Sequence, residues 1–480
     1  MRKSRGKDLI INTIIIGIGK FSTQLISFLL LPLYTSILTT EEYGIYDLII
    51  TISTFLLPVI TLLMEESMFR FLIDCKTDNE KKKVISQTAI YVIISSIIFL
   101  LLSIVISRII VIKYLVIGIV YIMTCIISAL RNALVRGLGK IKFYTVINFI
   151  ASLIDIILKV LLIAILKFGV YGLLISSIVS NIISSLIVFI SLKMYKYISF
   201  KSYDKLLMKK MIKYSIPLVP NSLSWTIVNL SDRFVISGVI GTSANGIYSM
   251  SYKFPNLMDT IYGFFYTAWK ESSAKAVNDY DKNEFFNNIF KMLIKLMFSV
   301  SIGIIACMPL IFNIFIKEAY KEAYMYIPIL VIAMYYNNMS GYFGGIFSAY
   351  KDTKIMGTTT IMGAIINLAV NLLLVKFIGI YAAAISTLIS CMVIYYYRKN
   401  KVNQYIKIES VNLIIGFIIL TSTLILYYIN SNIFIKILNL ILVCIYAFLE
   451  NKDIIIKMIK FIQKNKRGES LKWRINIFNF

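Results

Sequence analysis

The chain has 480 residues, of which 59% are hydrophobic and 15% are charged, with a net charge of +26 and a mean hydropathy of +0.81. A soluble protein of this length needs much more polar surface, so the composition excludes the ordinary soluble globular class. The sequence has no histidine and no C-x-x-C pair among its five cysteines. We therefore expect no histidine-bound metal, no disulfide framework, no cysteine–histidine nucleophile and no cofactor.

Apolar stretches of about 20 residues, the length that crosses a hydrocarbon core of about 30 Å, recur from one end of the chain to the other. The first is too long for a cleaved signal peptide and has no small-residue cleavage site. The pattern predicts an all-α integral membrane protein with about fourteen transmembrane helices. These are expected at residues 9–34, 44–68, 84–106, 109–130, 143–166, 170–193, 214–238, 246–268, 289–313, 324–347, 355–376, 380–397, 410–429 and 433–449.

Lysine and arginine are distributed unequally between the connections. Of the 50 basic residues, 38 lie in the N-terminus and in alternate connections, whereas the opposite connections hold seven. Positive charge resists translocation, so this bias predicts that both termini are cytoplasmic and that the number of spans is even. The basic loops also suit contact with anionic membrane lipids, and they lack the aromatic stacking platform that nucleic-acid binding would need.

Two short motifs recur along the chain. Gly-Ile-Tyr occurs at residues 44–46 and again at 246–248, which are 202 residues apart. The sequence KFGVYGLLISS, beginning at Lys167, is echoed by KFIGIYAAAIST, beginning at Lys376, at an offset of 209–210 residues. Two matches at nearly the same offset and the same topological place indicate an internal duplication. Each half has six predicted spans, so the halves would form parallel lobes around a central cavity.

This repeat predicts three parts. They are an N-terminal six-helix lobe at 1–213, a C-terminal six-helix lobe at 214–405, and two accessory helices with a basic cytoplasmic tail at 406–480. Prolines inside the spans, among them Pro58 and Pro255, are expected to bend helices in a bundle that has to rock.

Polar residues inside the predicted spans recur at helical spacing. A charge near the bilayer centre costs about 2.5–3.5 kcal/mol on insertion scales, so it usually faces a wet cavity or a partner. Lys20 lies near mid-depth on one face with Gln24 and has no acid on its own helix, which favours a cavity role. The stripes of the other spans contain Asp47, Thr51, Thr54, Thr61 and Glu65; Thr145, Asn148, Ser152, Asp155 and Lys159; Asn221, Trp225, Asn229, Asp232 and Arg233; Ser249, Lys253, Asn256, Asp259 and Thr260; and Asn367 and Asn371.

Several of these residues also have a purely structural interpretation. Asp155 and Lys159 are four residues apart with the acid first, which favours an internal ion pair. Asp232 and Arg233 are candidates for a lock between neighbouring helices. The asparagines of the eleventh span suit hydrogen bonds between helices, and Asp47 is near enough to a span end to be solvated.

Three stretches carry a resemblance to a known family. They are GKFSTQLISFLLLPLYTSILTTEEYGIYDL at 19–48, YSIPLVPNSLSWTIVNLSDRFVISGVIGTSANGIYSMSYKFPNL at 214–257, and TTTIMGAIINLAVNLLLVKFIGIYAAAIST at 358–387. The P-x-x-P-N and SDRF elements of the second stretch are the most specific. On these residues the chain resembles, over about residues 8–400, the polysaccharide-export flippases (Wzx type) of the multidrug/oligosaccharidyl-lipid/polysaccharide exporter superfamily, to which the MATE transporters also belong.

The resemblance implies a transporter of the cell membrane and not an enzyme. It implies that undecaprenyl-diphosphate-linked oligosaccharide is flipped from the cytoplasmic to the outer leaflet by alternating access, with a polysaccharide polymerase and other export machinery as possible partners. The cations suited to the diphosphate are Lys20, Arg233 and Lys253. The amides suited to the sugars are Gln24, Asn221, Asn229 and Asn256. The candidates for coupling to a proton or sodium ion are Asp155, Asp232 and Asp259.

Three other functions are also compatible with the sequence. A multidrug exporter of the MATE type would have an acidic and aromatic cavity, whereas deep basic residues are at least as prominent here. A lipid II flippase would share the diphosphate chemistry but carry different sugars and a peptide. A membrane glycosyltransferase or polymerase would need a large extracytoplasmic loop with an acidic or arginine-rich site, and the longest predicted outer connection has about ten residues.

Overall fold

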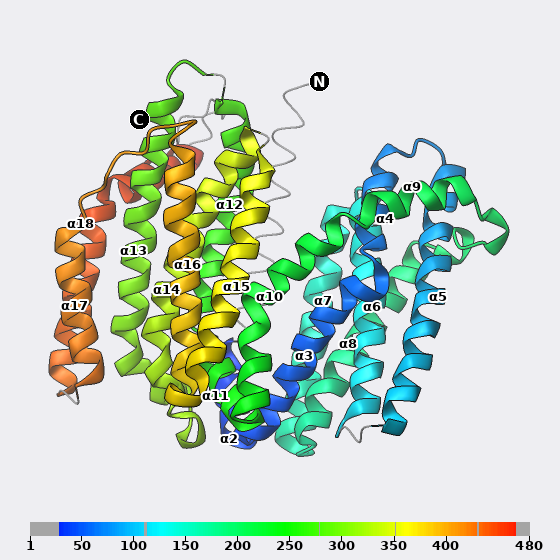
Figure 1. Cartoon of the computed structure of the whole chain (residues 1–480), viewed down its shortest axis with the longest axis horizontal. Coiled ribbons are helices and arrows are strands. Elements are labelled where there is room, and N and C mark those ends of the chain that lie inside the picture. The colour runs from blue at the N-terminus through cyan, green and yellow to red at the C-terminus, as the bar shows by residue number, and fades with distance from the viewer. Residues whose placement is uncertain (1–27, 110–112, 278, 351, 430–431, 467–480) are drawn as a thin grey trace. The chain divides into compact units, whose positions relative to one another are not determined.

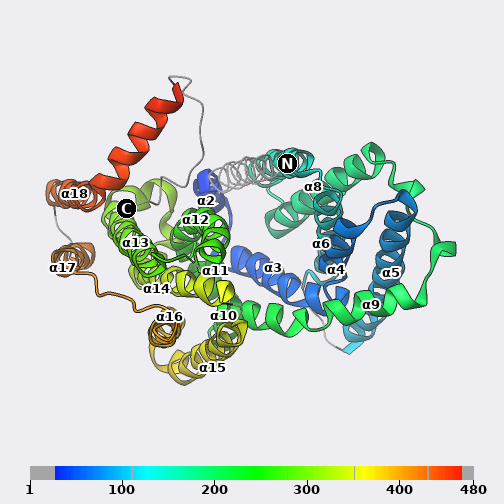
Figure 2. The ribbon, with the colours of Figure 1, turned by 90° about the horizontal axis from the view of Figure 1, so that it is seen from above.

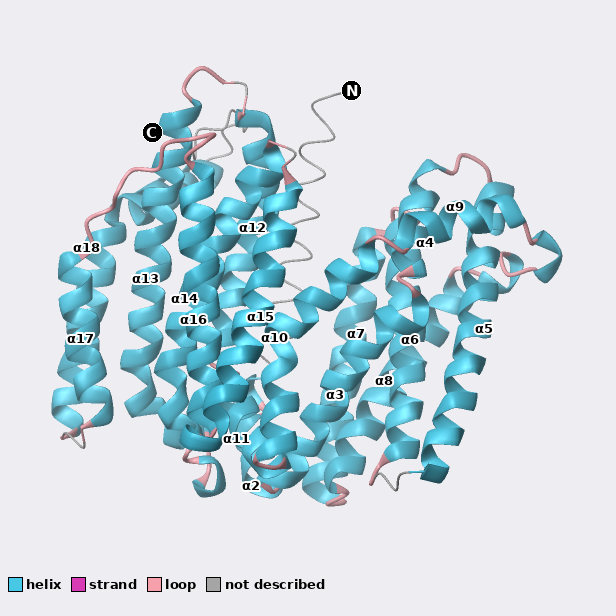
Figure 3. Cartoon of the chain, viewed as in Figure 1, coloured by secondary structure: helices cyan, strands magenta, loops and turns pink. Residues whose placement is uncertain are grey.

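The computed structural model of the chain describes residues 28–109, 113–277, 279–350, 352–429 and 432–466. Over these ranges the chain forms helices and loops and no strand (Figure 3). Among the described residues, nine helices are long and apolar enough to cross a membrane, and Ile414–Tyr428 is a shorter apolar helix. The prediction of an all-α multi-pass membrane protein is therefore confirmed. The count of fourteen spans is not confirmed, and most of the first predicted span lies outside the described residues.

Internal contacts divide the chain into two compact units, Met1–Gly246 and Ile247–Phe480. The helices of the first unit (Figure 1) are α2 (Leu31–Ile37), α3 (Thr40–Thr61), α4 (Met64–Asp74), α5 (Asp78–Ile109), α6 (Leu115–Gly137), α7 (Ile141–Lys159), α8 (Gly169–Ser191), α9 (Lys205–Ser215), α10 (Leu218–Val239) and the beginning of α11 (Thr242–Ser251). Those of the second unit are the end of α11, α12 (Pro255–Ala276), α13 (Lys282–Phe315), α14 (Ala323–Ala349), α15 (Thr353–Ile378), α16 (Ile380–Val402), α17 (Ile414–Tyr428) and α18 (Ile433–Lys466).

Side-chain caps define where two helices of the first unit begin. At the start of α3, Thr39 Oγ1 accepts from Glu42 N, and the Glu42 carboxylate accepts from Thr39 N, so two backbone N–H groups are satisfied reciprocally. At the start of α9, Asp204 Oδ1 accepts from Leu206 N and Leu207 N, at 3.0 Å in both cases. Both helices therefore begin at residues that the sequence specifies locally.

The second predicted helix, 44–68, is divided into α3 and α4. Leu62 and Leu63 both adopt the left-handed conformation, with φ of 48° and 54°. The break follows Pro58, which lacks a backbone N–H and weakens the last turn of α3. Thr61 Oγ1 accepts from Leu63 N at 3.2 Å, so the freed backbone group is satisfied at the break.

Two other predicted helices also change character along their length. The eighth, 246–268, is divided into α11 and α12, and Pro255 opens α12 at the position where a missing N–H costs nothing. The fifth, 143–166, continues from α7 into a π-helical turn, Val160–Ile165, that directly follows Lys159. Such turns in helices often mark functional sites.

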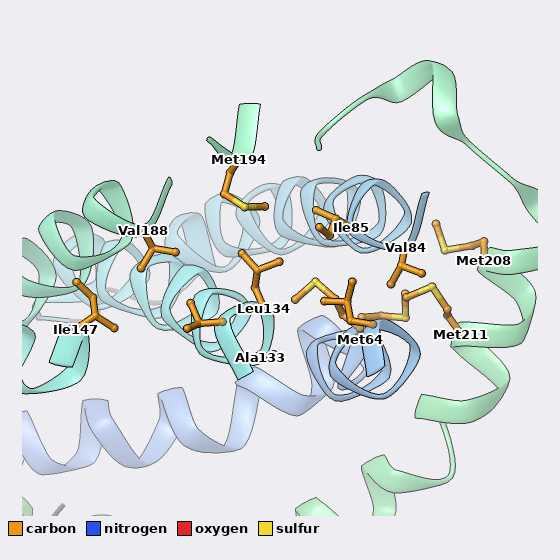
Figure 4. Close-up of a cluster of buried hydrophobic side chains, with 13 residues drawn as sticks. Met64, Val84, Ile85, Ala133, Leu134, Ile147, Val188, Met194, Met208 and Met211 are labelled. Carbon is orange, nitrogen blue, oxygen red and sulfur yellow. The ribbon is translucent and has the colours of Figure 1, made fainter. Parts of the chain in front are cut away.

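A cluster of buried apolar side chains holds one end of the first unit together (Figure 4). Ser67 Oγ donates to Met211 O at 3.1 Å, and Gln87 Nε2 donates to Ser202 O at 2.8 Å, so α9 and the segment before it are fastened to α4 and α5. The cluster is rich in methionine, whose flexible thioether fills irregular gaps. Its buried members are Met64, Met68, Leu72, Val84, Ile85, Ala133, Leu134, Val135, Ile147, Val188, Met194, Met208 and Met211.

In the second unit, α14 packs against α12, α13, α15 and α16. Trp269 Nε1 donates to Tyr342 O at 2.9 Å, and a Cβ at Gly345 would overlap the Trp269 ring. Small residues thus let aromatic rings approach the α14 backbone closely. α14 is long enough to span but is not among the nine apolar spans, because its tyrosines, asparagines and glycines lower its mean hydropathy.

The two C-terminal helices belong to the packing of the second unit. α17 and α18 both pack against α13 (Figures 1 and 2). Lys295 Nζ of α13 lies 2.8 Å from the Glu450 carboxylate of α18, and Asn451 Nδ2 donates to Ser299 Oγ at 3.0 Å. These contacts attach α18 to α13 through polar groups that hydrocarbon would not satisfy.

The boundary between the two contact units differs from the boundary between the sequence repeats. Residues 214–246, which open the second repeat, group with the first unit, where α10 contacts α3. The lobes at 1–213 and 214–405 and the accessory part at 406–480 are defined by the repeat and remain a prediction.

The segments that end at the glycines of the two Gly-Ile-Tyr motifs, 40–44 and 242–246, cross where α3 and α11 begin. A Cβ on Gly44 would overlap the carbonyl oxygen of Thr242, and a Cβ on Gly246 would overlap the carbonyl oxygen of Thr40. Thr40 and Thr242 are also 202 residues apart, so each segment makes the same contact with the other. Thr40 Oγ1 and Ser243 Oγ share a hydrogen bond of 2.6 Å. The crossing is therefore close enough to require glycine on both helices.

We predict that Gly44→Ala lowers the free energy of unfolding by about 1–3 kcal/mol, because the new methyl group overlaps backbone that cannot move aside. Loss of helical circular dichroism on heating would measure this in detergent. Gly238→Ala is the matched control, because a Cβ there meets open space. Equal unfolding midpoints for Gly44→Ala and Gly238→Ala would contradict the prediction.

Candidate functional site

A polar cleft of about 380 Å³ lies between α6, α7 and α8 in the first unit. Its walls are rich in hydroxyl, amide and charged side chains, although all three helices are apolar enough to cross a membrane. Polar groups at such positions usually face water or a ligand. The lining residues are Tyr121, Ser128, Arg131, Tyr144, Thr145, Asn148, Phe149, Ala151, Ser152, Asp155, Ser177, Ser180 and Asn181.

The α7 wall of the cleft is the polar stripe that the sequence predicts for the fifth helix. Thr145, Asn148, Ser152 and Asp155 follow one another at intervals of three or four residues and all line the cleft. Two of the hydroxyls bond the preceding turn: Thr145 Oγ1 donates to Ile141 O at 3.2 Å, and Ser152 Oγ donates to Asn148 O at 3.0 Å. Their lone pairs remain available as acceptors.

Asp155 forms the predicted ion pair with Lys159. The Lys159 Nζ atom lies 2.7 Å from Asp155 Oδ2, and Ser177 Oγ donates to Asp155 Oδ1 at 2.9 Å. Lys159 is only 7% exposed and also donates to the Tyr46 hydroxyl at 3.4 Å. The negative charge of Asp155, a candidate for ion coupling, is thus balanced within the first unit.

Arg131 is a cleft residue that the sequence analysis did not select. Its position near a predicted helix end grouped it with the cytoplasmic basic loops, but in the structure it is 5% exposed. Its Nη2 donates to Ser128 Oγ at 2.9 Å and to Asn148 Oδ1 at 3.2 Å, and its Nη1 donates to Ser184 Oγ. In the described part of the chain no carboxylate lies within ion-pair distance of it. The spacing from Ser128 was the available signal, because it extends a polar face of α6.

Arg233, a predicted diphosphate ligand, forms an ion pair between α10 and α3. Its Nε lies 2.7 Å from Asp47 Oδ2, and both side chains are largely buried. Asn245 of α11 donates to Gly44 O at 3.0 Å and is 3.5 Å from the same Asp47 oxygen. The arrangement agrees with the interhelical lock that the sequence offered as an alternative. Asp47 is therefore a partner of Arg233 and not a solvated residue at a span end.

Four other predicted site residues lie wholly or partly outside the described residues. Lys20 and Gln24 lie outside the described residues. Asn221 and Asn229 fall on α10, but their side chains lie outside the described part of the chain. The structure thus leaves their predicted roles untested.

The remaining predicted residues lie on α10, α11 and α12. Asp232 is buried on α10. Lys253 lies between α11 and α12, and Asn256 lies in the first turn of α12; both are half-buried. The structure brings none of these residues to the cleft in the first unit.

Asp259 of α12 faces Asn338 of α14 within the second unit. Neither Asp259 Oδ1 nor Asn338 Nδ2, both buried, reaches hydrogen-bond geometry with any described residue. Asn367 Nδ2 donates to Thr387 Oγ1 at 3.2 Å and so joins α15 to α16, as the structural interpretation predicts. Across the described residues, no group of three or more cysteine, aspartate or glutamate side chains is arranged to hold a metal ion.

A family profile described as "Polysaccharide biosynthesis protein" matches residues 9–270, which is more than half of the chain. The chain belongs to the polysaccharide biosynthesis protein family. The matched region contains the first two stretches on which the predicted resemblance rests, 19–48 and 214–257, as well as every residue that lines the cleft. No curated protein sequence matches the chain.

Solved structures of membrane transporters share the fold of this family member. The structure of lipid II flippase MurJ in an inward closed conformation aligns over 92% of this chain and 100% of its own, with a TM-score of 0.72 and 18% identity. An inward-facing multidrug resistance MATE family transporter of the MOP superfamily aligns over 81% of this chain and 98% of its own, with a TM-score of 0.63 and 14% identity. An outward-facing multidrug resistance MATE family transporter aligns over 83% of this chain and 96% of its own, with a TM-score of 0.53 and 17% identity. These similarities show the fold.

We predict that Arg233→Gln destabilises the protein by about 3–5 kcal/mol, because it leaves the buried Asp47 charge without its partner. The double variant Asp47→Asn/Arg233→Gln should recover most of this loss, since it removes both charges. Thermal unfolding in detergent would measure each change.

Lys321→Gln is the control for this prediction, because its ion pair with Glu318 is exposed and should contribute little. A double variant that is as unstable as Arg233→Gln alone would contradict the role of the buried pair.

Proposed function

We propose that this chain is a flippase that moves an undecaprenyl-diphosphate-linked oligosaccharide from the cytoplasmic leaflet to the outer leaflet by alternating access. The observation that carries the proposal is the match of residues 9–270 to the polysaccharide biosynthesis family, a region that contains the polar cleft of α6, α7 and α8. A family concerned with polysaccharide synthesis, in the fold of membrane transporters, suits the movement of a glycan across the membrane.

The chemistry of the substrate suits the surfaces of the protein. Sugars need hydroxyl and amide groups, which the cleft supplies from α7 and α8. The lipid tail needs contact with hydrocarbon, and α5 carries an outward row of exposed apolar side chains. This row includes Ile93, Ile94, Ile97, Ile98, Leu101, Leu102, Ile104 and Val105. The tail can therefore remain in the bilayer while the head group crosses.

In this proposal the diphosphate binds cations in a cavity between the two predicted six-helix lobes, with both termini in the cytoplasm. The resemblance to polysaccharide-export flippases assigns this role to Lys20 and Lys253, and Arg233 is left out because Asp47 balances its charge. Arg233 instead holds α10 to α3. Gln24, Asn221, Asn229 and Asn256 serve as sugar contacts along the same path, and a polymerase would receive the product at the outer leaflet.

A multidrug exporter and a lipid II flippase are the competing functions. The MATE structures support the first through the shared fold, and MurJ supports the second. The cleft argues against a site built for cationic drugs, because its unbalanced charge is the positive charge of Arg131. A lipid II flippase would differ in the cargo, which a transport assay with both lipids distinguishes.

The test is transport in liposomes that contain the purified chain. We predict that a fluorescent undecaprenyl-diphosphate-linked oligosaccharide flips faster than in empty liposomes, as measured by its accessibility to an impermeant quencher. Lys20→Ala should slow flipping at least about tenfold, because a charge-assisted contact to the diphosphate is lost. Lys113→Ala, which removes an exposed lysine between α5 and α6, is the control.

Two outcomes separate the parts of this proposal. Flipping no faster than in empty liposomes, or faster flipping of lipid II than of the oligosaccharide lipid, would contradict the proposed substrate. A wild-type rate in Lys20→Ala would contradict its cationic role and leave the flippase function standing.

We also propose that Asp259 couples transport to a proton or sodium ion. Asp155 is less suited, because Lys159 balances its charge, whereas among the described residues no cation lies within ion-pair distance of Asp259. Asp259→Asn should therefore abolish the acceleration of flipping by an imposed proton or sodium gradient. The exposed Asp453→Asn of α18 is the control. Acceleration that persists in Asp259→Asn would exclude this role.

A further inference from the structure

Arg131 is a buried cation that stands beside the cleft of the first unit. The guanidinium is 5% exposed and always carries its charge under physiological conditions. A charge removed from water is costly unless a counter-charge or a full set of hydrogen bonds replaces the water. The chain must therefore compensate this group, and the way it does so indicates what the cleft can bind.

The groups around the guanidinium are neutral. Ser128, Asn132 and Asn148 accept from Nη2, at 2.9, 3.2 and 3.2 Å, and Ser184 accepts from Nη1. Hydroxyl and amide oxygens satisfy N–H groups but do not cancel a full positive charge. Nη1 has two N–H groups and only the Ser184 acceptor in the part of the chain that the structure describes, so one N–H remains for a ligand oxygen.

The acid of the same cleft does not supply the missing charge. Asp155 is bound to Lys159 at 2.7 Å and accepts from Ser177 at 2.9 Å. Arg131, Lys159 and Asp155 together thus carry one net positive charge. This excess is located at Arg131, because the other two residues neutralise each other.

We propose that Arg131 is an oxyanion-binding residue, and that the cleft between α6, α7 and α8 takes a phosphate group of the lipid-linked substrate. The inference rests on the proposed flippase function and adds a further cation, Arg131, to the two already proposed for the diphosphate, Lys20 and Lys253. Arginine N–H groups donate to phosphate oxygens, and the burial of Arg131 strengthens that interaction, because water screens the charge less. The hydroxyls of Thr145 and Ser152 extend from this point along α7 and suit the adjoining sugars.

A second buried arginine provides the comparison. Arg398 of the second unit is also 5% exposed and also has neutral acceptors, among them Thr359 Oγ1 at 2.9 Å and Ser340 O at 3.2 Å. It does not line this cleft. Arg398 Nη1 also has a single acceptor among the described residues, so neutral coordination and a remaining N–H do not define an anion site by themselves. The adjacent cleft distinguishes Arg131 from Arg398.

The test measures binding of radiolabelled pyrophosphate to the full chain in nanodiscs of neutral phosphatidylcholine. Arg131→Gln should weaken binding at least about tenfold, because it removes the charge and part of the donor set. The affinity of Arg131→Lys for pyrophosphate should lie between those of the wild type and Arg131→Gln, since lysine keeps the charge without the planar guanidinium. Arg398→Gln is the matched control and should bind as the wild type does.

A second pair of variants keeps the arginine in place. Ser128→Asp puts a carboxylate on the same helix three residues before Arg131, where it supplies an internal counter-charge. It should bind pyrophosphate about tenfold more weakly than Ser128→Asn, which has the same size without the charge. Helical circular dichroism without ligand shows whether each variant is folded, so the inference can be tested even if Arg131→Gln fails to fold.

Competition and transport distinguish the source of the phosphate. Undecaprenyl diphosphate should displace pyrophosphate at a lower concentration than phosphatidylglycerol does. Equal displacement by the two lipids would make the cleft a site for bulk anionic lipid and would overturn the substrate assignment. Unchanged pyrophosphate binding in folded Arg131→Gln and Ser128→Asp would overturn the anion site itself. Arg131-dependent binding without flipping would refute the proposed flippase function alone, whereas wild-type flipping in Arg131→Gln would refute this inference alone.

Discussion

Inside a hydrocarbon layer a polar group has no water to bond with, so each polar side chain on a spanning helix has to be satisfied by the protein or by a ligand. The structure meets this constraint in three ways. Many hydroxyls, such as Ser53 Oγ bonding Ile49 O at 2.6 Å, return to their own helix. Others join two helices, as Asn451 does with Ser299. Charges are paired across helices, as Arg233 is with Asp47. Arg131 has only neutral partners among the described residues, and that is why it marks the cleft as a place for a ligand.

The duplication in the sequence has a direct consequence in the first unit. The equivalent glycines, Gly44 and Gly246, occupy a crossing at which each faces the carbonyl oxygen of the equivalent threonine, Thr242 or Thr40, of the other segment. Any side chain at either position would separate the two backbones. The Asp47–Arg233 pair lies one turn from this crossing along α3 and joins the same helix to α10. Residues that begin the second repeat are therefore integral to the packing of the first contact unit.

The family match and the structural similarities describe the function of related proteins in different terms. The family match concerns polysaccharide biosynthesis and covers the helices of the cleft, whereas the structural similarities include a lipid II flippase and multidrug transporters. One fold thus occurs in a lipid II flippase and in multidrug transporters, so the fold alone does not identify a cargo. The proposal of an anionic, hydroxyl-rich cargo draws on three features of the first unit: the neutralised charge of Asp155, the unbalanced charge of Arg131 and the polar lining of the cleft.

The sequence by itself determined the membrane class, the helical secondary structure, the stripe that forms the α7 wall of the cleft and the Asp155–Lys159 pair. These features depend on hydropathy and on spacing of three or four residues within one helix, which the chain order already contains. Only the tertiary structure decided that Arg233 pairs with Asp47, that Leu62 and Leu63 break the second helix, and that Arg131 is buried beside a cleft. Each of these depends on helices that are distant in sequence or on local backbone strain, and a single helical period carries no information about which neighbour a side chain will meet.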